Sequence, residues 1–171
     1  MTIDQLKRIS KASTARLEKV YPLLIKYMTM YDITTNARIA AFLAQIIHES
    51  GNFYYTKEIA SGKAYEGRKD LGNVNVGDGV KYKGRGFIQI TGRANYAQLS
   101  KATQIDFINS PELLESTENA VMSACWWWNM KGLNKMADNY EFIRITKVIN
   151  GGTNGLVQRK AIYLTAQKVL G

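Results

Sequence analysis

Apolar residues recur at helical spacing over most of the chain. In the clearest stripe they stand at i, i+3, i+4, i+7 and i+8, namely Ile39, Phe42, Leu43, Ile46 and Ile47. This spacing is typical of one face of an amphipathic helix. Candidate N-caps at positions 34–36 precede the stripe, and Ser50-Gly51 follows it as a stop. The pattern predicts a helix that reaches Glu49.

Other segments combine weaker stripes with helix start signals. Thr2 with Gln5, and Asp138 with Glu141, have the spacing of a capping box. A proline at position 111 suits the first position of a helix. Helices are therefore expected near residues 3–9, 17–28, after 110, and over 117–130, 142–149 and 155–170. The sequence predicts a mostly α protein.

Residues 62–92 interrupt this pattern. They hold eight of the 14 glycines, at 62, 67, 72, 77, 79, 84, 86 and 92. Such a density indicates turns, left-handed backbone or close backbone approach. Phe87, Ile88 and Ile90 are expected to form a short strand piece, within an ordered loop that carries a small hairpin.

Length and composition narrow the class of protein. A chain of 171 residues suits one domain, and its net charge of +9 favours anionic partners such as nucleic acid, acidic lipids or a cell wall. A single cysteine excludes an internal disulfide and a single histidine excludes a multi-histidine zinc site, so no metal or cofactor is expected. The first residues have no secretory apolar run, which predicts a protein made in the cytoplasm.

The first candidate for chemistry is His48-Glu49, at the end of the strongest predicted helix. The negative helix terminus and apolar neighbours would favour the protonated form of Glu49, as a general acid requires. The alternative is a solvated glutamate at a helix end. A zinc-protease site is excluded because position 52 is Asn rather than His.

A second set of carboxylates follows, comprising Glu58, Glu66, Asp70 and Asp78. Glycoside hydrolysis commonly needs two carboxylates, one acting as acid and one as base or nucleophile. Each of these residues alone is also compatible with a plain surface charge, and their spacing does not choose between them.

Residues 82–96 mix glycines, basic groups, amides, a hydroxyl and aromatics, which suits contact with sugars. The alternative is a turn with a polar edge. Asn150, before two glycines, is a C-cap or a ligand contact. Trp126, Trp127 and Trp128 cannot share one helix face, so two are expected in the core and one at a surface or groove.

Together these motifs resemble glycoside hydrolase family 19. Residues 42–51 are similar to the catalytic helix end of that family, residues 82–96 to its Gly-Arg-Gly…Asn-Tyr signature, and residues 150–152 to its late Asn-Gly-Gly motif. Residues 66–73 and 77–79 resemble the short bacteriophage branch more than the plant chitinases. The resemblance runs from about residue 36 to the C-terminus.

The resemblance implies a mainly α, lysozyme-like bilobal fold with the glycine-rich loop and small β-hairpin region lining a substrate groove. It also implies hydrolysis with inversion at the anomeric carbon. Glu49 would be the general acid, Thr91 would help to hold the attacking water, and Glu58 would be the base, with Glu66 as the alternative base.

The family's sugar contacts correspond to a further group of residues in this sequence. They are His48, Arg85, Gln89, Asn95, Tyr96, Asn150 and Arg159.

Phage proteins of this type are endolysins, so the expected activity is cleavage of peptidoglycan glycan strands for host lysis. The alternative is a chitinase with the same mechanism. The expectation is a single catalytic domain over 1–171, monomeric, without a separate wall-binding module, held in the cytoplasm of a Gram-negative host until a holin releases it. The basic C-terminal segment would contact the anionic outer membrane. A nucleic-acid-binding module is motivated by charge alone, and no nucleic-acid partner is expected.

Overall fold

Helix α3 (Asn36–Glu49) lies at the centre of the fold in the computed structural model, which describes all 171 residues. Its residues from Ile39 to Ile47 are all buried, and three neighbouring helices pack against it. The ring of Trp128 meets Phe42 edge-on, with 5.3 Å between the ring centroids.

Eleven further helical elements complete the fold. In chain order they are α1 (Ile3–Ile9), α2 (Thr14–Met30), η1 (Lys63–Tyr65), η2 (Lys69–Leu71), α4 (Asp78–Lys81), α5 (Arg93–Thr103), η3 (Pro111–Glu115), α6 (Thr117–Met130), α7 (Leu133–Asp138), α8 (Phe142–Asn150) and α9 (Leu156–Leu170).

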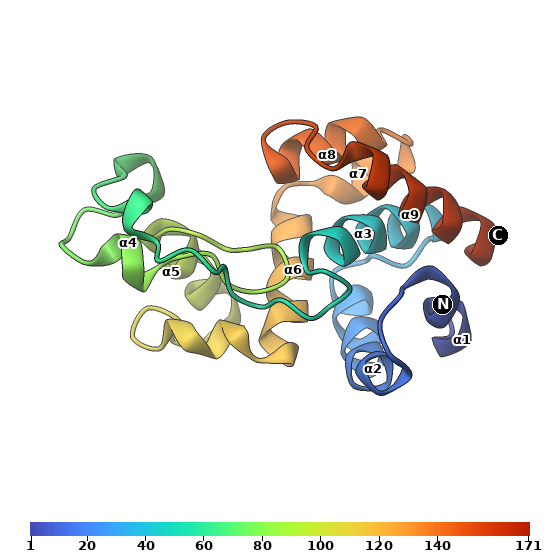
Figure 1. Cartoon of the computed structure of the whole chain (residues 1–171), viewed down its shortest axis with the longest axis horizontal. Helices are drawn as coiled ribbons and strands as arrows, with labels where there is room; N and C mark the ends of the chain where they lie inside the picture. Colours follow the sequence, from blue (N-terminus) through green and yellow to red (C-terminus); the bar gives the residue numbers. More distant parts are fainter.

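The chain forms two lobes (Figure 1). In the larger lobe α3 packs against α7, α8 and α9, while α1 packs against α2 and α9. The smaller lobe holds the short elements from η1 to η3, and α6 connects it to the larger lobe. The expected mainly α, bilobal architecture is therefore confirmed.

The caps explain where several helices begin. The capping box of Thr2 and Gln5 is present, and Thr35 caps α3 by accepting a hydrogen bond from the Arg38 N–H. The predicted box of Asp138 and Glu141 is wrong. Asp138 ends α7 and pairs with Arg38, and the carboxylate of Glu141 pairs with an arginine one turn into α8.

Helix α6 matches the predicted range of 117–130. Trp126 and Trp128 are buried and Trp127 is half-buried, as the helical spacing predicts. None of the helices combines the length and the apolar run that a membrane crossing needs.

The glycine-rich region is ordered but contains no continuous strand. The expected hairpin is reduced to two isolated antiparallel bridges, Lys57 with Arg85 and Arg85 with Ile90. The strand piece predicted at 87–90 is a turn, because Gly86 (φ 81°) and Gln89 (φ 55°) are left-handed and interrupt an extended backbone. The bridges nonetheless hold residues 56–58 against 84–86, which brings Glu58 beside the Gly-Arg-Gly turn.

Candidate active site

Glu49 is the last residue of α3, and its side chain is 22% exposed. The chain turns sharply after it, because Gly51, Asn52 and Phe53 all have positive φ, between 56° and 69°. The Ser50 hydroxyl accepts a hydrogen bond from the Phe53 N–H at 2.8 Å and so fixes this turn. The helix end therefore presents Glu49 at a defined place on the surface of the larger lobe.

Arg159 of α9 is the direct partner of Glu49, and its guanidinium donates to the carboxylate. The Arg159 side chain is only 1% exposed. It also donates to Gln45 Oε1 at 2.7 Å and to the Asn154 carbonyl at 3.1 Å. A neighbourhood of apolar groups was expected around Glu49, but its direct partner is the buried guanidinium of Arg159.

Gln45 holds this guanidinium in place. It is completely buried in α3, and its Nε2 donates to Thr146 Oγ1 at 2.9 Å while its Oε1 accepts from Arg159. Sequence reasoning missed Gln45 and Thr146. The available signal was a lone amide inside the apolar run of α3, because a buried amide needs partners.

His48 faces α9 rather than open solvent. A Cβ atom on Gly155 would lie 2.3 Å from His48 Nε2, so the glycine allows the ring to pack directly against the backbone. Burial, followed by the positive charge of Arg159, lowers the pKa of His48. The imidazole is therefore neutral at pH 7. Its role as a sugar contact stays a prediction.

Three predicted polar groups converge around Gly84. A Cβ atom at this position would lie 2.8 Å from Gln89 Oε1, 3.2 Å from Glu58 Oε2 and 3.3 Å from Thr91 Oγ1. Sequence motifs placed Gln89 and Thr91 together, and the structure adds Glu58 to them. Gly84 is thus the residue whose missing side chain lets these groups meet.

Glu58 has one occupied and one free carboxylate oxygen. Oε2 accepts a hydrogen bond from the Tyr65 hydroxyl at 3.0 Å, whereas Oε1 is buried with no protein partner. Burial, assisted by the Glu58 charge, raises the pKa of Tyr65, so the phenol remains a donor. A buried carboxylate oxygen without a donor is unfavourable. Oε1 is therefore suited to accept a hydrogen bond.

The Glu66 carboxylate is engaged by backbone groups of the glycine-rich loop. Oε1 accepts from the Gly77 N–H at 2.6 Å and Oε2 from the Gly79 N–H at 2.8 Å. Both oxygens thus serve to fasten residues 77–79. Between the two candidate bases, this arrangement favours Glu58.

Arg85 and Tyr96 were expected to contact sugar, and the structure corrects this. Tyr96 is fully buried, and its hydroxyl donates to the Lys83 carbonyl at 2.7 Å and accepts from Arg85 at 3.0 Å. Arg85 is 8% exposed and also pairs with Glu115 at 2.8 Å. Burial raises the pKa of Tyr96 to about 12. Both side chains support the loop instead of facing a ligand.

Asn95 and Asn150 are half-buried and each keeps part of its amide free. Asn95 Nδ2 donates to the Thr91 carbonyl at 2.7 Å, and Asn150 Oδ1 accepts from the Asn154 N–H at 3.2 Å. The Asn154 carbonyl in turn accepts a hydrogen bond from Arg159. The turn after α8 therefore also positions the partner of Glu49.

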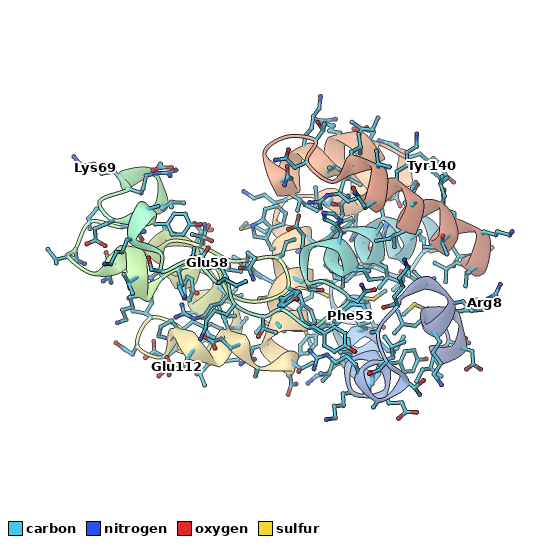
Figure 2. All side chains as sticks on the ribbon, in the orientation of Figure 1. Arg8, Phe53, Glu58, Lys69, Glu112 and Tyr140 are labelled. Carbon is cyan, nitrogen blue, oxygen red and sulfur yellow. The ribbon has the colours of Figure 1, made fainter.

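No cluster of three or more His, Cys, Asp or Glu side chains has a metal-binding arrangement. Figure 2 shows Glu58 in the smaller lobe, whereas Glu49 ends a helix of the larger lobe. The candidate site thus combines two carboxylates from different lobes. Glu49 lies beside a buried cation, and Glu58 lies near a hydroxyl and an amide and has one buried oxygen without a partner.

Residues 24–145 match the family described as "Chitinase class I". A "Glycosyl hydrolase family 19 domain-containing protein" of Haemophilus influenzae is 31% identical over 155 residues, which cover 72% of this chain and 76% of that protein. "Endochitinase At2g43620" of Arabidopsis thaliana is 37% identical over 121 residues. The match covers 67% of this chain but only 39% of the plant protein.

Two solved structures share the fold. A bacterial family 19 chitinase superimposes with a TM-score of 0.79 at 23% identity, covering 99% of this chain and 94% of that one. Chitinase C from Streptomyces griseus HUT6037 gives a TM-score of 0.76 at 22% identity, covering 99% and 76% of the two chains. At this identity the likeness concerns the fold.

Proposed function

The chain belongs to glycoside hydrolase family 19, and from this premise we propose that it cleaves the glycan strands of bacterial peptidoglycan with inversion at the anomeric carbon. The observation that carries the proposal is the different setting of the two carboxylates. Glu49 lies beside the buried Arg159, and Glu58 meets Thr91 and Gln89 around Gly84 through Oε2 while its Oε1 is buried without a partner.

In the proposed reaction the Glu49 carboxyl group gives a proton to the glycosidic oxygen as the C–O bond breaks. Arg159 then stabilises the carboxylate that forms. Glu58 takes a proton from a water molecule that attacks the anomeric carbon from the opposite face, and Thr91 with Gln89 orients that water. The products are a new reducing end and a free hydroxyl, and exchange with solvent restores both carboxyl groups.

Charge favours peptidoglycan over chitin. Peptidoglycan carries carboxylates on its peptides, and a protein of net charge +9 is attracted to such a polymer. Chitin remains a second candidate, because plant relatives are named endochitinases. The match covers only 39% of the length of the first of these proteins. The substrate of the whole plant protein is therefore not assigned to this chain.

The proposal extends to the biological setting. The likeness of residues 66–73 and 77–79 to the short phage branch supports a monomeric endolysin that stays in the host cytoplasm until a holin releases it. Lys160 and Lys168 lie exposed on α9 and would contact the anionic outer membrane. Reversing both charges should then slow lysis of intact cells more than lysis of cells stripped of that membrane.

The substrate is tested by incubating the protein with purified Gram-negative peptidoglycan and, separately, with chitin oligomers. Mass spectrometry of the soluble fragments identifies the bond that is cut. We expect disaccharide-peptide fragments from peptidoglycan at a rate well above that of chitin cleavage. Rapid cleavage of chitin with no fragments from peptidoglycan would contradict the proposal in favour of a chitinase.

A further inference from the structure

A pocket of about 450 Å³ lies between α1, the end of α3 and α9, and shares only His48, Gly51 and Asn52 with the site described above. Its volume falls within the range of about 300–1,000 Å³ typical of small-ligand sites. Eight of its twelve lining residues lie before residue 24 or after residue 145, outside the stretch that matches the family. Nothing in the proposed hydrolysis uses these residues.

The polar lining of the pocket consists largely of unused donors. None of the twelve lining residues is acidic. Arg8 and Lys11 are exposed and take part in no ion pair. Asn52 Oδ1 accepts from Ser10 Oγ at 3.2 Å and from the Lys11 N–H at 2.9 Å, which leaves Nδ2 as a donor. Such a lining selects an anionic ligand.

The remaining lining is apolar. Ile9 and Ile47 are nearly buried, at 6% and 2% exposure, and Ile162 is half-buried beside them. A free inorganic anion would gain nothing from this apolar surface. The combination instead suits a chain that carries small apolar groups together with carboxylates.

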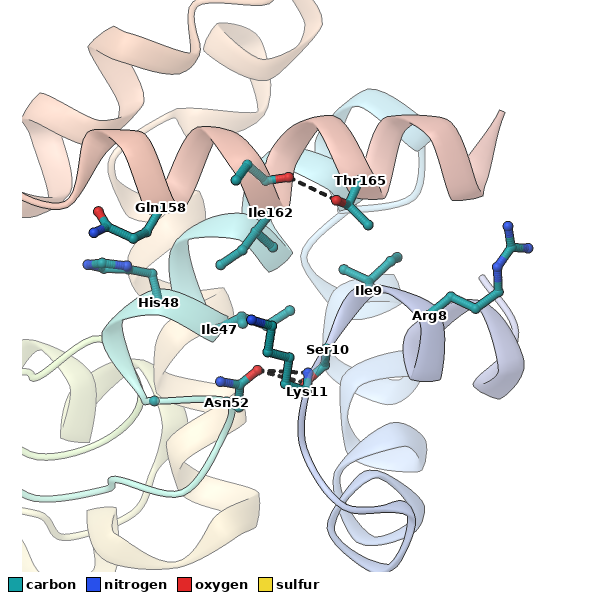
Figure 3. A pocket seen from close by; sticks show the side chains of 12 residues that line it. Arg8, Ile9, Ser10, Lys11, Ile47, His48, Asn52, Gln158, Ile162 and Thr165 are labelled. Carbon is teal, nitrogen blue, oxygen red and sulfur yellow. Dashed lines mark hydrogen bonds between the residues drawn. The ribbon is translucent and has the colours of Figure 1, made fainter.

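The position of the pocket links it to the candidate site. His48 and Gln158 lie at one end of it and Arg8 at the other (Figure 3). Glu49 is the next residue after His48 on the same helix, about 100° around the axis. A substituent on a sugar held at Glu49 could therefore enter at His48 and run along α9 toward Arg8 and Lys11.

We propose that this pocket binds the peptide stem of the peptidoglycan strand, with the stem's methyl groups on the isoleucines and a carboxylate at Arg8 and Lys11. This inference rests on the proposed function and makes it more specific, since chitin has no peptide. Recognition of the stem would lower KM for glycan that carries peptides relative to glycan from which an amidase has removed them.

Two readouts separate this proposal from the proposed function. The first is hydrolysis of glycan strands with and without peptides. The second is binding of the free tetrapeptide of L-alanine, D-isoglutamate, meso-diaminopimelate and D-alanine, followed through the imidazole NMR signals of His48. The chain has a single histidine, so these signals report directly on the pocket.

The test variant is Arg8→Glu with Lys11→Glu, and the matched control is Lys19→Glu with Lys101→Glu. All four positions are exposed and both pairs change the net charge equally. We expect the peptide to shift the His48 signals in the wild type and the control, and the test variant to bind it about tenfold more weakly. The preference for peptide-bearing glycan should be lost in the test variant alone.

Three results would overturn the proposal. They are unchanged His48 signals at millimolar peptide, equal peptide affinity in the test and control variants, and His48 shifts caused by anionic lipid vesicles but not by the peptide. Failure to cleave either form of glycan would instead contradict the proposed function, and the binding measurement would still decide on the pocket.

Discussion

Replacing Gly84 by alanine should damage the candidate site while leaving the fold intact. Gly84 has no positive φ, so its backbone conformation is open to alanine. The new methyl group would lie 2.8 Å from Gln89 Oε1, 3.2 Å from Glu58 Oε2 and 3.3 Å from Thr91 Oγ1. All three distances are shorter than an ordinary contact, which begins at 3.4 Å.

The size of the effect follows from these distances. Gln89 Oε1 must retreat by about 3.4 − 2.8 = 0.6 Å, against a hydrogen bond of 2.8 Å that ties Gln89 Nε2 to the Gly86 carbonyl. Misplacement of a reacting group by about 1 Å costs on the order of 10²-fold in rate, so we expect kcat to fall about 10- to 100-fold. Overpacking lowers the free energy of unfolding by about 1–3 kcal/mol. The smaller conformational freedom of alanine in the unfolded chain raises it by about 0.4–1 kcal/mol.

The assay is the rate of release of reducing ends from purified peptidoglycan, together with urea unfolding of each variant. Gly152→Ala is the matched control, because its methyl group would meet only Asn150 Oδ1, at 3.8 Å, and Gly152 also lacks a positive φ. The control should keep the wild-type kcat. A folded Gly84→Ala variant with wild-type kcat would refute the idea that Glu58, Gln89 and Thr91 act together at this point.

Three further predictions concern the carboxylates and their supports. Glu58→Gln should lower kcat at least 100-fold with little change in the free energy of unfolding by urea. Glu66→Gln should lower that free energy, because the carboxylate holds the loop, and should keep most of kcat. The reverse order of the two kcat values would make Glu66 the base. Gln45→Met should cost about 1–3 kcal/mol, because it leaves a buried N–H of Arg159 without an acceptor, and should also lower kcat; unchanged urea unfolding and kcat would contradict this. Asp78 is nearly buried, and the hydrogen bond from its arginine partner lowers its pKa from the usual 3.8. The ion pair therefore stabilises the folded state above about pH 3.8, and this stabilisation is lost as the pH falls further. Asp78→Asn should therefore be less stable at pH 6, and its unfolding free energy should fall less steeply below pH 4; parallel pH profiles would contradict the assignment.

Local patterns were sufficient to predict α1, α2, α3, α6, α8 and α9, but not α4, α5 or α7. The stripe of α3, the cap at Thr35 and the range of α6 each depend on residues a few positions apart. The strand piece at 87–90 failed because apolar residues can also be buried in a turn. The predicted cap of Asp138 and Glu141 was wrong because their carboxylates form ion pairs with arginines, Asp138 with Arg38 and Glu141 with Arg144. The sequence pattern does not show these partners.

The site was predictable as a set of residue types but not as a set of roles. Glu58 and Glu66 look alike in sequence, and only the folded loop shows that backbone N–H groups occupy both oxygens of Glu66. Tyr96 and Arg85 carry the chemistry of sugar contacts, yet packing turns them inward. Gln45 was overlooked because its partner lies 114 residues away in the sequence.

The most direct test of the account is a proton NMR spectrum of a soluble peptidoglycan oligomer, recorded in the first minutes of hydrolysis by the wild type and by Glu49→Gln. We expect the wild type to release the α-anomer at the new reducing end, before it equilibrates, as inversion of a β-linkage requires. The folded Glu49→Gln variant should release almost none. Initial release of the β-anomer, or turnover by Glu49→Gln close to that of the wild type, would contradict the assignment of Glu49 and Glu58 as an inverting pair.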